Sequence, residues 1–325
     1  AEPENSWWQQ LGGEELDTLM TTAFSGSFSL RQAWSRVEQA RATSIITGSS
    51  LWPAVDYDGS AAHQHQYQND QRTRSESFAL GVVGSYELDL WGRIRSETTA
   101  QQREQQATEE DWQTARITLR SEIANNWLNS VALREQATII ERQIKTARNI
   151  VELTQLRYLE GQATRSDLVE RQQELHQFEQ SRLELEQSLS QYHYDLCLLS
   201  GLAPGAALTI NRQLLPRVTP LPDVGLPADL IGQRPDVRAA GLRLNKGDWL
   251  VSAARADRLP ELKLSADAGY SSSRFADLLD NWLANLAASI TGPAFDAGAR
   301  RAEVTRARAE AEELLAAYEE TVITA

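Results

Sequence analysis

The sequence has almost no cysteine and no long hydrophobic run. Its one cysteine, Cys197, excludes a disulfide within the 325-residue chain. The surrounding Tyr-Asp-Leu-Cys-Leu-Leu predicts a buried helix face, so Cys197 is interpreted as a small core residue rather than a reactive thiol. No stretch of 18 or more apolar residues occurs, which excludes a transmembrane helix. A role in a membrane would therefore have to use strands, whose alternating pattern is much weaker in each segment.

Positive charge is also scarce. The chain carries 32 Lys and Arg against 45 Asp and Glu, a formal net charge of −13, and has no basic cluster. Nucleic-acid binding requires a basic face that neutralises phosphates, so the sequence predicts no nucleic-acid partner. The carboxylate runs Glu109-Glu110-Asp111 and Glu312-Glu313 are interpreted as ordinary surface charge on solvated helix faces.

Motifs of catalysis and of cofactor or metal binding are absent as well. No nucleophile elbow, phosphate loop or dinucleotide fingerprint occurs, so the sequence predicts a protein that is not an enzyme, with no catalytic residues and no cofactor. His63 and His65 share one face of a predicted strand, but a metal site needs three or four ligands and no further pattern completes one. No metal is therefore expected, and His176 and His193 are interpreted as structural residues on helices.

The sequence does contain an internal duplication. Gly92 and Gly298 stand 206 residues apart, and Trp112 and Tyr318 are separated by the same distance. Each half has the same order of features: a helix, a proline that ends it, two strand-like segments and a long helix. A period of this length indicates a duplicated domain-sized unit rather than a solenoid. The first repeat is assigned to residues 1–202, a Pro- and Gly-rich connector to 203–227, and a second, incomplete repeat to 228–325.

The predicted fold class is mainly α with β, and both repeats contribute the same elements. The first repeat holds an N-terminal tract, a helix over 30–47, a β-hairpin over 51–91, a long helix over 93–159 and a return helix over 164–200. The second repeat holds a helix over 236–257, a β-hairpin over 259–294 and the start of a long helix over 297–325.

Alternation with a period of two predicts the strands. From Phe78 to Leu90 every second residue is apolar or glycine, and the intervening positions include Ser85, Glu87 and Asp89. The second hairpin alternates in the same way over 262–270 and 282–290. We therefore expect strands with unlike faces, joined by polar tips at 69–77 and 271–280.

The long helix is predicted by its heptad pattern and by the absence of breakers. No proline occurs from Arg93 to Leu159, a span of 67 residues or about 100 Å at ~1.5 Å per residue. Apolar residues recur at steps of 4 and 3 in both this helix and the return helix, which is typical of a coiled-coil seam. Gly161 is placed at the C-terminal cap, and Thr164 with Asp167 forms a capping-box pattern at the next helix start.

Four strands in one chain cannot close a barrel, which makes an oligomer necessary if the strands enter lipid. Three copies would supply twelve strands, enough for a closed barrel with a lumen, and would gather the helices into a hollow bundle. A soluble antiparallel coiled coil with small β-hairpins remains an alternative. The second repeat stops within its long helix at Ala325, so the chain is expected to lack roughly 80 to 100 residues of a complete duplication.

Six motifs in the expected order resemble the outer-membrane factors of tripartite efflux pumps, the TolC-like family. The resemblance covers essentially the whole chain. The motifs are Trp7-Trp8-Gln9-Gln10-Leu11-Gly12, Ser35 to Ala42, Tyr86 to Arg93, Arg157 to Gly161 with Ser166 to Val169, Gln233 to Ala240, and Gly292 to Gly298.

This resemblance implies a homotrimer with a 12-stranded β-barrel in the outer membrane of a Gram-negative bacterium and an α-helical barrel in the periplasm. It implies contact with outer-membrane lipid, with a periplasmic membrane-fusion (adaptor) protein and, through the adaptor, with an inner-membrane RND-type transporter. The expected function is a passive exit channel for drugs or other toxic small molecules. The outer-membrane duct of a type I protein secretion system is the alternative within this architecture.

Two groups of site residues follow from the matched motifs. Adaptor contact is expected at the helical tip, although these residues could equally serve only to cap the turn: Arg157, Tyr158, Gly161, Ser166 and Asp167. Four aromatic residues are expected at the membrane interface: Trp52, Tyr86, Trp91 and Trp282. The residues that close the periplasmic tip in the family are expected beyond Ala325, and any N-terminal lipid-bearing cysteine upstream of Ala1.

Overall fold

The computed structural model describes residues 7–68, 71–208, 210–212, 214–216 and 227–325. The chain divides into two compact units, of which unit 1 comprises residues 1–34 and 112–225 and unit 2 comprises residues 35–111 and 226–325. These units differ from the predicted repeats because α2 (Phe28–Ser49) and α3 (Arg93–Leu159) each contribute to both units. Within the described ranges, no helix combines the length and the hydrophobicity needed to cross a membrane.

Unit 1 is helical and has its core where α1 (Trp7–Gly26) meets α3 and α4 (Arg165–Leu199). Trp127 of α3 is fully buried there with Leu16 of α1 and Leu196 of α4. Its indole Nε1 donates to the Glu15 carboxylate at 2.8 Å, and the other oxygen of Glu15 accepts the backbone N–H of Asn211 at 2.8 Å. One carboxylate thus joins the core tryptophan to the segment that follows α4. The sulfur of Cys197 is also completely buried, as the sequence predicts.

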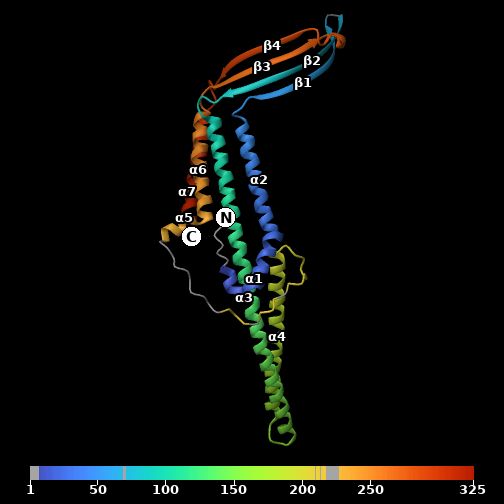
Figure 1. Ribbon diagram of the computed structural model, residues 1–325, viewed down its shortest axis with the longest axis vertical. Coiled ribbons are helices and arrows are strands. Elements are labelled where there is room, and N and C mark those ends of the chain that lie inside the picture. Colours follow the sequence, from blue (N-terminus) through green and yellow to red (C-terminus); the bar gives the residue numbers. More distant parts are fainter. Residues whose placement is uncertain (1–6, 69–70, 209, 213, 217–226) are drawn as a thin grey trace. The chain divides into compact units, whose positions relative to one another are not determined.

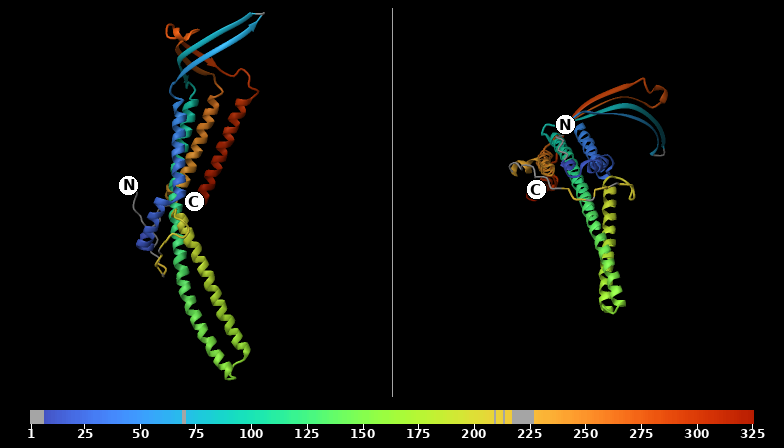
Figure 2. Two further views of the ribbon diagram at one scale, coloured as in Figure 1. Left: turned by 90° about the vertical axis from the view of Figure 1, so that its right-hand side faces the viewer. Right: turned by 60° about the horizontal axis from the view of Figure 1, so that its bottom comes forward.

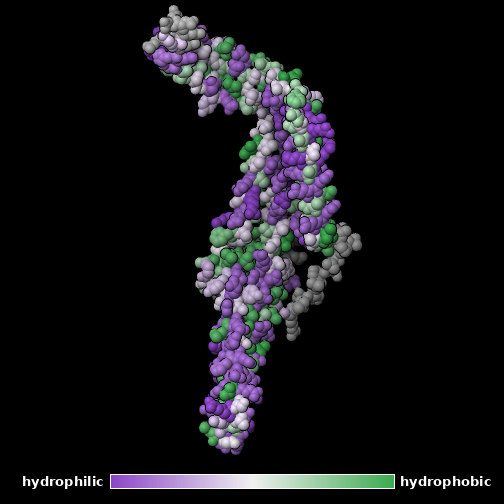
Figure 3. All heavy atoms as spheres, turned by 180° about the vertical axis from the view of Figure 1, so that it is seen from behind, coloured by the Kyte–Doolittle hydropathy of each residue, from purple (hydrophilic) through white to green (hydrophobic). Residues whose placement is uncertain are grey.

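The two long helices of unit 1 form an antiparallel hairpin, and Figures 1 and 2 show α3 and α4 running side by side to a short turn. α3 begins at Arg93 and ends at Leu159, the bounds predicted for the long helix. A salt bridge from Arg148 to Glu179, 2.8 Å long, links the two helices in this hairpin. Figure 3 shows a predominantly hydrophilic surface along the hairpin, with isolated hydrophobic residues.

Two glycines end the helices of unit 1 in the same way. Gly161 and Gly201 have φ of 75° and 69°, the left-handed conformation that favours glycine. At the first, the N–H of Gln162 donates to the carbonyl of Arg157 and that of Gly161 to Tyr158, the Schellman pattern. Gly201 differs in its surroundings, because a Cβ atom there would lie 2.0 Å from the carbonyl oxygen of Gly26 in α1.

Unit 2 contains a four-stranded antiparallel sheet in the order β1-β2-β3-β4. The strands extend from the ends of α2, α3, α6 (Pro235–Ala256) and α7 (Ala299–Thr324), as Figure 1 shows. Their bounds are Ala54–Gln68 for β1, Gln71–Leu88 for β2, Glu261–Ser272 for β3 and Trp282–Thr291 for β4. The two hairpins therefore pair side by side through β2 and β3.

One predicted strand boundary is wrong. Residues 71–77, expected in a polar tip, belong to β2 and pair with residues 62–68 of β1. Polar side chains do not prevent a strand, because the ladder satisfies the backbone and cross-strand pairs such as His63 with Glu76 satisfy the side chains. The second tip matches better, since β3 ends at Ser272, a 3₁₀ turn covers Phe275–Asp277 and β4 begins at Trp282.

The helices of unit 2 are held together by ion pairs as well as by apolar contacts. Arg238 of α6 pairs with Glu110 of α3 at 2.6 Å, and Arg243 of α6 pairs with Asp111. The side chain of Glu110 is only 16% exposed. The interpretation as ordinary surface charge is therefore wrong for Glu110 and Asp111, because their basic partners come from a helix more than 120 residues away in sequence.

α6 and α7 approach closely at a glycine. A Cβ atom on Gly247 would lie 3.0 Å from the Leu314 side chain and 3.3 Å from the Cα of Ala311. Small residues around Val251 and Val304 complete this contact. α7 begins at Ala299 rather than at the predicted Ala297, because Ala297 and Gly298 have positive φ and form the bend after β4.

Candidate functional site

The sheet has one strongly apolar face. The register places Val82 opposite Tyr57 and Ala268, and Leu80 opposite Gly59 and Tyr270, so alternate residues of all four strands share this face. Most of its large side chains are exposed, with Leu286 82% and Ile290 75% accessible. The other apolar members include Val55, Phe78, Tyr86, Leu88, Leu262, Leu264, Ala266, Trp282, Ala284 and Ala288.

The opposite face of the sheet is polar and acidic. Asp56, Val83, Asp267 and Asn285 form one row across the four strands. The Asn285 amide donates to the Asp267 carboxylate at 2.9 Å. Asp58, Glu87, Glu261, Lys263 and several serines share this face, and Val83 and Leu283 are its large apolar exceptions. The sheet is therefore amphipathic across its whole width.

The apolar face is long enough to match the apolar band of an outer-membrane barrel. It extends along β2 from Phe78 to Leu88, ten steps or about 34 Å at ~3.4 Å per residue. At the ~40° tilt of strands in a closed barrel, this length corresponds to a height of roughly 26 Å. Outer-membrane barrels carry an apolar band of about 25 Å.

The four aromatic residues predicted for a membrane interface lie at the two ends of this face. Tyr86 lies near the helical end of β2, and Trp52 and Trp91 lie just outside β1 and β2 at the same end. The indole of Trp91 donates to the carbonyl oxygen of Pro260 at 2.7 Å, which fixes the entry to β3. Trp282 lies at the other end, opposite Tyr270.

Aspartates cap the helices that leave the sheet. The carboxylate of Asp89 accepts the backbone N–H of Ile94 and Arg95 at 3.1 and 2.9 Å. Burial alone would raise the pKa of Asp89, but these hydrogen bonds and the Arg95 guanidinium outweigh it and lower the pKa below its ordinary value. Asp296 accepts the N–H of Gly298 and Arg300 at the start of α7. Sequence reasoning missed both caps, although aspartate just before a helix is their usual signal.

The five residues predicted to contact an adaptor all lie at the turn between α3 and α4. Thr164 and Asp167 form the reciprocal capping box, with N···O distances of 2.8 and 3.2 Å. The hydrogen bonds with Thr164 lower the pKa of Asp167. Arg157, Tyr158 and Ser166 are exposed. Asp167 and Gly161 thus have a structural task at this turn, whereas the other three present side chains to solvent.

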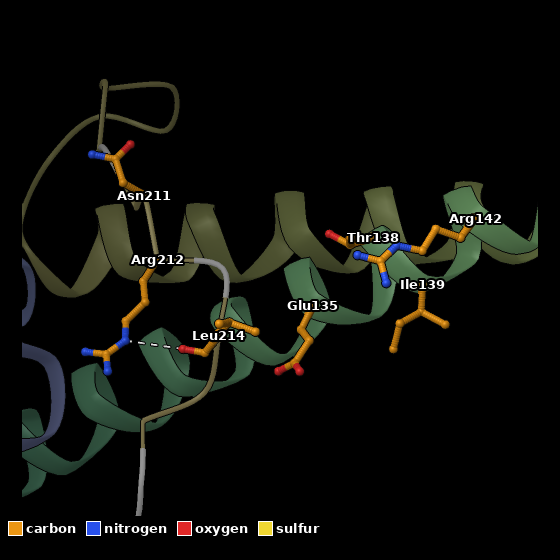
Figure 4. A pocket seen from close by; sticks show the side chains of 7 residues that line it. All are labelled: Glu135, Thr138, Ile139, Arg142, Asn211, Arg212 and Leu214. Carbon is orange, nitrogen blue, oxygen red and sulfur yellow. Dashed lines mark hydrogen bonds between the residues drawn. The ribbon is translucent and has the colours of Figure 1, made fainter.

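A cavity of about 820 Å³ lies in unit 1 where the segment after α4 crosses α3. Figure 4 shows Glu135 and Arg142 projecting from α3, and the Arg212 guanidinium directed at the carbonyl of Leu214, 3.2 Å away. Glu135 accepts the N–H of Leu215 at 3.4 Å. The polar groups of this cavity therefore anchor the segment itself. Within the described residues, no group of three or more His, Cys, Asp or Glu side chains could hold a metal ion.

The chain combines an amphipathic four-stranded sheet with a coiled-coil helical hairpin, and comparison with known sequences gives its family. The sequence model described as "Outer membrane efflux protein" matches residues 19–202 and 226–325. The chain belongs to this family.

The chain is similar to named relatives over nearly its whole length. It is 33% identical to the pyoverdine export outer membrane protein OpmQ of Pseudomonas putida, covering 99% of this chain and 71% of the relative. It is 33% identical to the outer membrane protein OprJ of Pseudomonas aeruginosa, covering 98% and 68%. It is 28% identical to the cation efflux system protein CusC of Escherichia coli O157:H7, covering 98% and 70%.

Solved structures agree with this assignment. The outer-membrane channel OprN matches with a TM-score of 0.88 at 28% identity, covering 99% of this chain and 74% of that one. A CusC structure matches with a TM-score of 0.85 at 24% identity, covering 99% and 76%, and supports the fold. The predicted mainly α fold with β-hairpins, the outer-membrane location in a Gram-negative bacterium and the role in efflux are confirmed. Family membership also decides against the soluble coiled-coil alternative.

Proposed function

We propose that three copies of this chain form one outer-membrane duct with a closed barrel of twelve strands. The exposed apolar face across all four strands carries this proposal, because a solvated monomer rarely exposes so large an apolar surface. β1 and β4 are the two edges of the described sheet. Pairing β4 of one copy with β1 of the next would satisfy both edges, as lipid requires. The apolar face would then contact lipid and the acidic face would line water.

The helices would form the periplasmic part of the duct. The two predicted repeats, 1–202 and 228–325 joined by 203–227, would each supply a strand pair and helices to this ring. α6 and α7 already pack closely against each other at Gly247. The salt bridge between Arg148 and Glu179 likewise stiffens the α3–α4 hairpin. Rigid helical walls of this kind would keep a wide path open, so that a substrate could pass without having to deform the protein.

The tip of the α3–α4 hairpin is proposed as the contact for a periplasmic adaptor, which would connect the duct to an inner-membrane RND-type transporter. The side chains of Arg157, Tyr158 and Ser166 are exposed there, and the capping hydrogen bonds of the turn use only the backbone carbonyls of Arg157 and Tyr158. Gly161 and Asp167 would hold the turn in the shape that the adaptor recognises. In this scheme the transporter supplies the energy, and the chain catalyses no reaction.

The transported molecules are proposed to be small and chemically diverse toxic compounds. Relatives of the chain are named for pyoverdine export, cation efflux and fusaric acid resistance. Proteins of one family serve these different tasks, which supports a passive conduit whose substrate is selected by its partners.

A matched pair of lysine substitutions tests the orientation of the sheet. Leu286 lies midway along β4 on the apolar face, and Ala287 is its neighbour on the acidic face. Leu286→Lys would place a charge in lipid at a cost of about 2–4 kcal/mol per copy, whereas Ala287→Lys would face water. We expect Leu286→Lys to abolish the detergent-extracted trimer and drug resistance in an efflux-deficient Gram-negative host, and Ala287→Lys to retain both.

Equal trimer yields for the two variants would refute this arrangement of the sheet. A wild-type trimer that restores export of a protein through an ABC exporter, but restores no drug resistance, would identify type I secretion as the function instead. Native mass measurement and drug susceptibility are therefore both needed.

A further inference from the structure

Two histidine side chains of β1 lie in contact with each other, and the proposed duct assigns them no role. Nε2 of His63 and Nε2 of His65 are 3.0 Å apart, and their ring centroids are 4.6 Å apart with the planes at 78°. They follow Ala61 on the same side of the sheet as the apolar face, beyond its last apolar row. The position is accessible, since the His63 side chain is 40% exposed.

A carboxylate orients one of the two rings. Nδ1 of His63 lies 3.2 Å from Oε1 of Glu76, its direct partner on β2. Glu76 accepts through its carboxylate, so a neutral His63 carries its proton on Nδ1, and its Nε2 lone pair faces Nε2 of His65. A carboxylate bound to the distal nitrogen of a histidine is the usual second shell of a metal ligand, because it fixes the tautomer and raises the basicity of the ligand.

The nitrogen separation indicates a coordination geometry. Two imidazole nitrogens each about 2.0–2.1 Å from one ion are roughly 2.9 Å apart at a right angle and roughly 3.4 Å apart at a tetrahedral angle. The observed 3.0 Å fits adjacent ligands at a right angle. Such angles suit Cu²⁺ or Ni²⁺ in tetragonal sites better than Zn²⁺ in a tetrahedral site.

We propose that His63 and His65 form a bidentate surface site for Cu²⁺, with Ni²⁺ as the weaker alternative. Water completes the coordination, since within the described part of the chain no third His, Cys, Asp or Glu side chain joins the two nitrogens. In the apo form one proton is shared between the two Nε2 atoms, and His65 supplies it. On metal binding, neutral His65 carries this proton on Nδ1 instead, so that both Nε2 lone pairs reach the ion without net proton release.

A neighbouring cation limits the affinity of the site. Arg74 is the direct partner of His65 on β2, and its guanidinium lies 3.3 Å from Oε1 of Glu76. Arg74 therefore competes with His63 for the carboxylate and repels a bound dication. The site is an exchangeable one on the outer surface of the sheet, and it requires neither transport nor a partner protein.

Calorimetric titration with CuCl₂ tests the proposal on the full protein in detergent, purified without a histidine tag. We expect one ion per chain in the wild type. His63→Ala and His65→Ala should each weaken binding by about 100-fold, and Glu76→Gln by about tenfold. Arg74→Gln should strengthen it, because a competing cation is removed. His176→Ala, which changes a histidine on a helix of unit 1, serves as the matched control and should bind as the wild type does.

The electron paramagnetic resonance spectrum of the Cu²⁺ complex should show two nitrogen ligands, and should lose one in His63→Ala. Circular dichroism and the native mass of each variant establish that it is folded. Copper affinity of His63→Ala or His65→Ala within about threefold of the wild type would overturn the proposal. Because the titration involves no export, this outcome is distinct from failure of the duct itself.

Discussion

At the scale of single residues, glycines and aspartates determine where the long helices begin and end. Gly161 and Gly201 have nearly the same backbone conformation and the same hydrogen-bonding pattern. Their surroundings differ, because the space around Gly161 is open and Gly201 faces the carbonyl of Gly26. The two positions therefore separate the cost of left-handed backbone from the cost of a close approach between α1 and the end of α4.

We expect Gly161→Ala to lower the free energy of unfolding by about 1 kcal/mol, since alanine tolerates the left-handed conformation poorly. Gly201→Ala should cost about 1–3 kcal/mol more, because its Cβ would overlap the Gly26 carbonyl and force α1 away from the unit 1 core. Thermal unfolding followed by circular dichroism at 222 nm measures both. Equal losses of unfolding free energy in the two variants would show that α1 shifts freely and that the close approach of Gly26 and Gly201 does not contribute to stability.

Sequence patterns predict the capping glycine at 161 because Schellman caps need only local chemistry. The contact of Gly201 with Gly26 was not predictable, since it depends on two segments that are 175 residues apart. The same holds for Glu15, whose role is visible only when Trp127 and Asn211 are seen on either side of its carboxylate. Local sequence patterns therefore predict where helices end. The tertiary contacts made at each helix end are visible only in the structure.

At the scale of elements, hydrophobic periodicity predicted the long helix and the strands well. α3 spans 93–159 as its heptads indicate, and the alternation from Phe78 to Leu90 matches the apolar face of β2. Residues 71–77 of β2 were missed, because a polar strand lacks an alternating signal. The pairing of α3 with α6 was also missed, since Glu104, Glu110 and Asp111 look like any solvated charges until their basic partners are located.

The α3–α6 pairing should make the stability of unit 2 depend on pH. Glu104 pairs with Lys246 at 2.9 Å and with Arg243 at 3.5 Å. Burial would raise its pKa, but these two cations outweigh burial and lower the pKa below its ordinary value of 4.5. Ionised Glu104 therefore stabilises the fold above about pH 4.5, and this contribution is lost as the pH falls through the lowered pKa.

Glu104→Gln should consequently cost about 1–2 kcal/mol at pH 7 and much less near pH 3. The melting temperatures of wild type and variant should converge as the pH is lowered. Glu312→Gln is the matched control, because Glu312 is an exposed carboxylate on α7, and its melting curve should follow that of the wild type at every pH. A gap between Glu104→Gln and wild type that is constant from pH 7 to pH 3 would contradict the assigned pairing.

At the scale of the whole molecule, family membership and the amphipathic sheet lead to the same description, an outer-membrane channel for efflux. The sequence indicated this through the order of six weak motifs and through the duplication. It could not indicate how the carboxylates of different strands line up across the sheet, because alternation within one strand does not give the register between strands. The register does so, by placing Asp56 and Asp267 in one row and Asp58 on the same face.

Three copies of this acidic face would surround a lumen with repeated carboxylates, so the open duct should favour cations over anions. In lipid bilayers with a tenfold KCl gradient, we expect a reversal potential that shows preference for K⁺. The triple variant Asp56→Asn, Asp58→Asn and Asp267→Asn should move this potential toward zero, because the other carboxylates of this face, Glu87 and Glu261, are paired with Arg93 and Lys263. Raising the salt to 1 M should also weaken the preference of the wild type for K⁺, since the Debye length falls to about 3 Å.

The control variant Glu76→Gln removes a carboxylate from the opposite side of the sheet and should leave the reversal potential unchanged. A potential that responds to Glu76→Gln but not to the triple variant would mean that the sheet closes with its acidic face outward, contrary to the arrangement proposed for the duct.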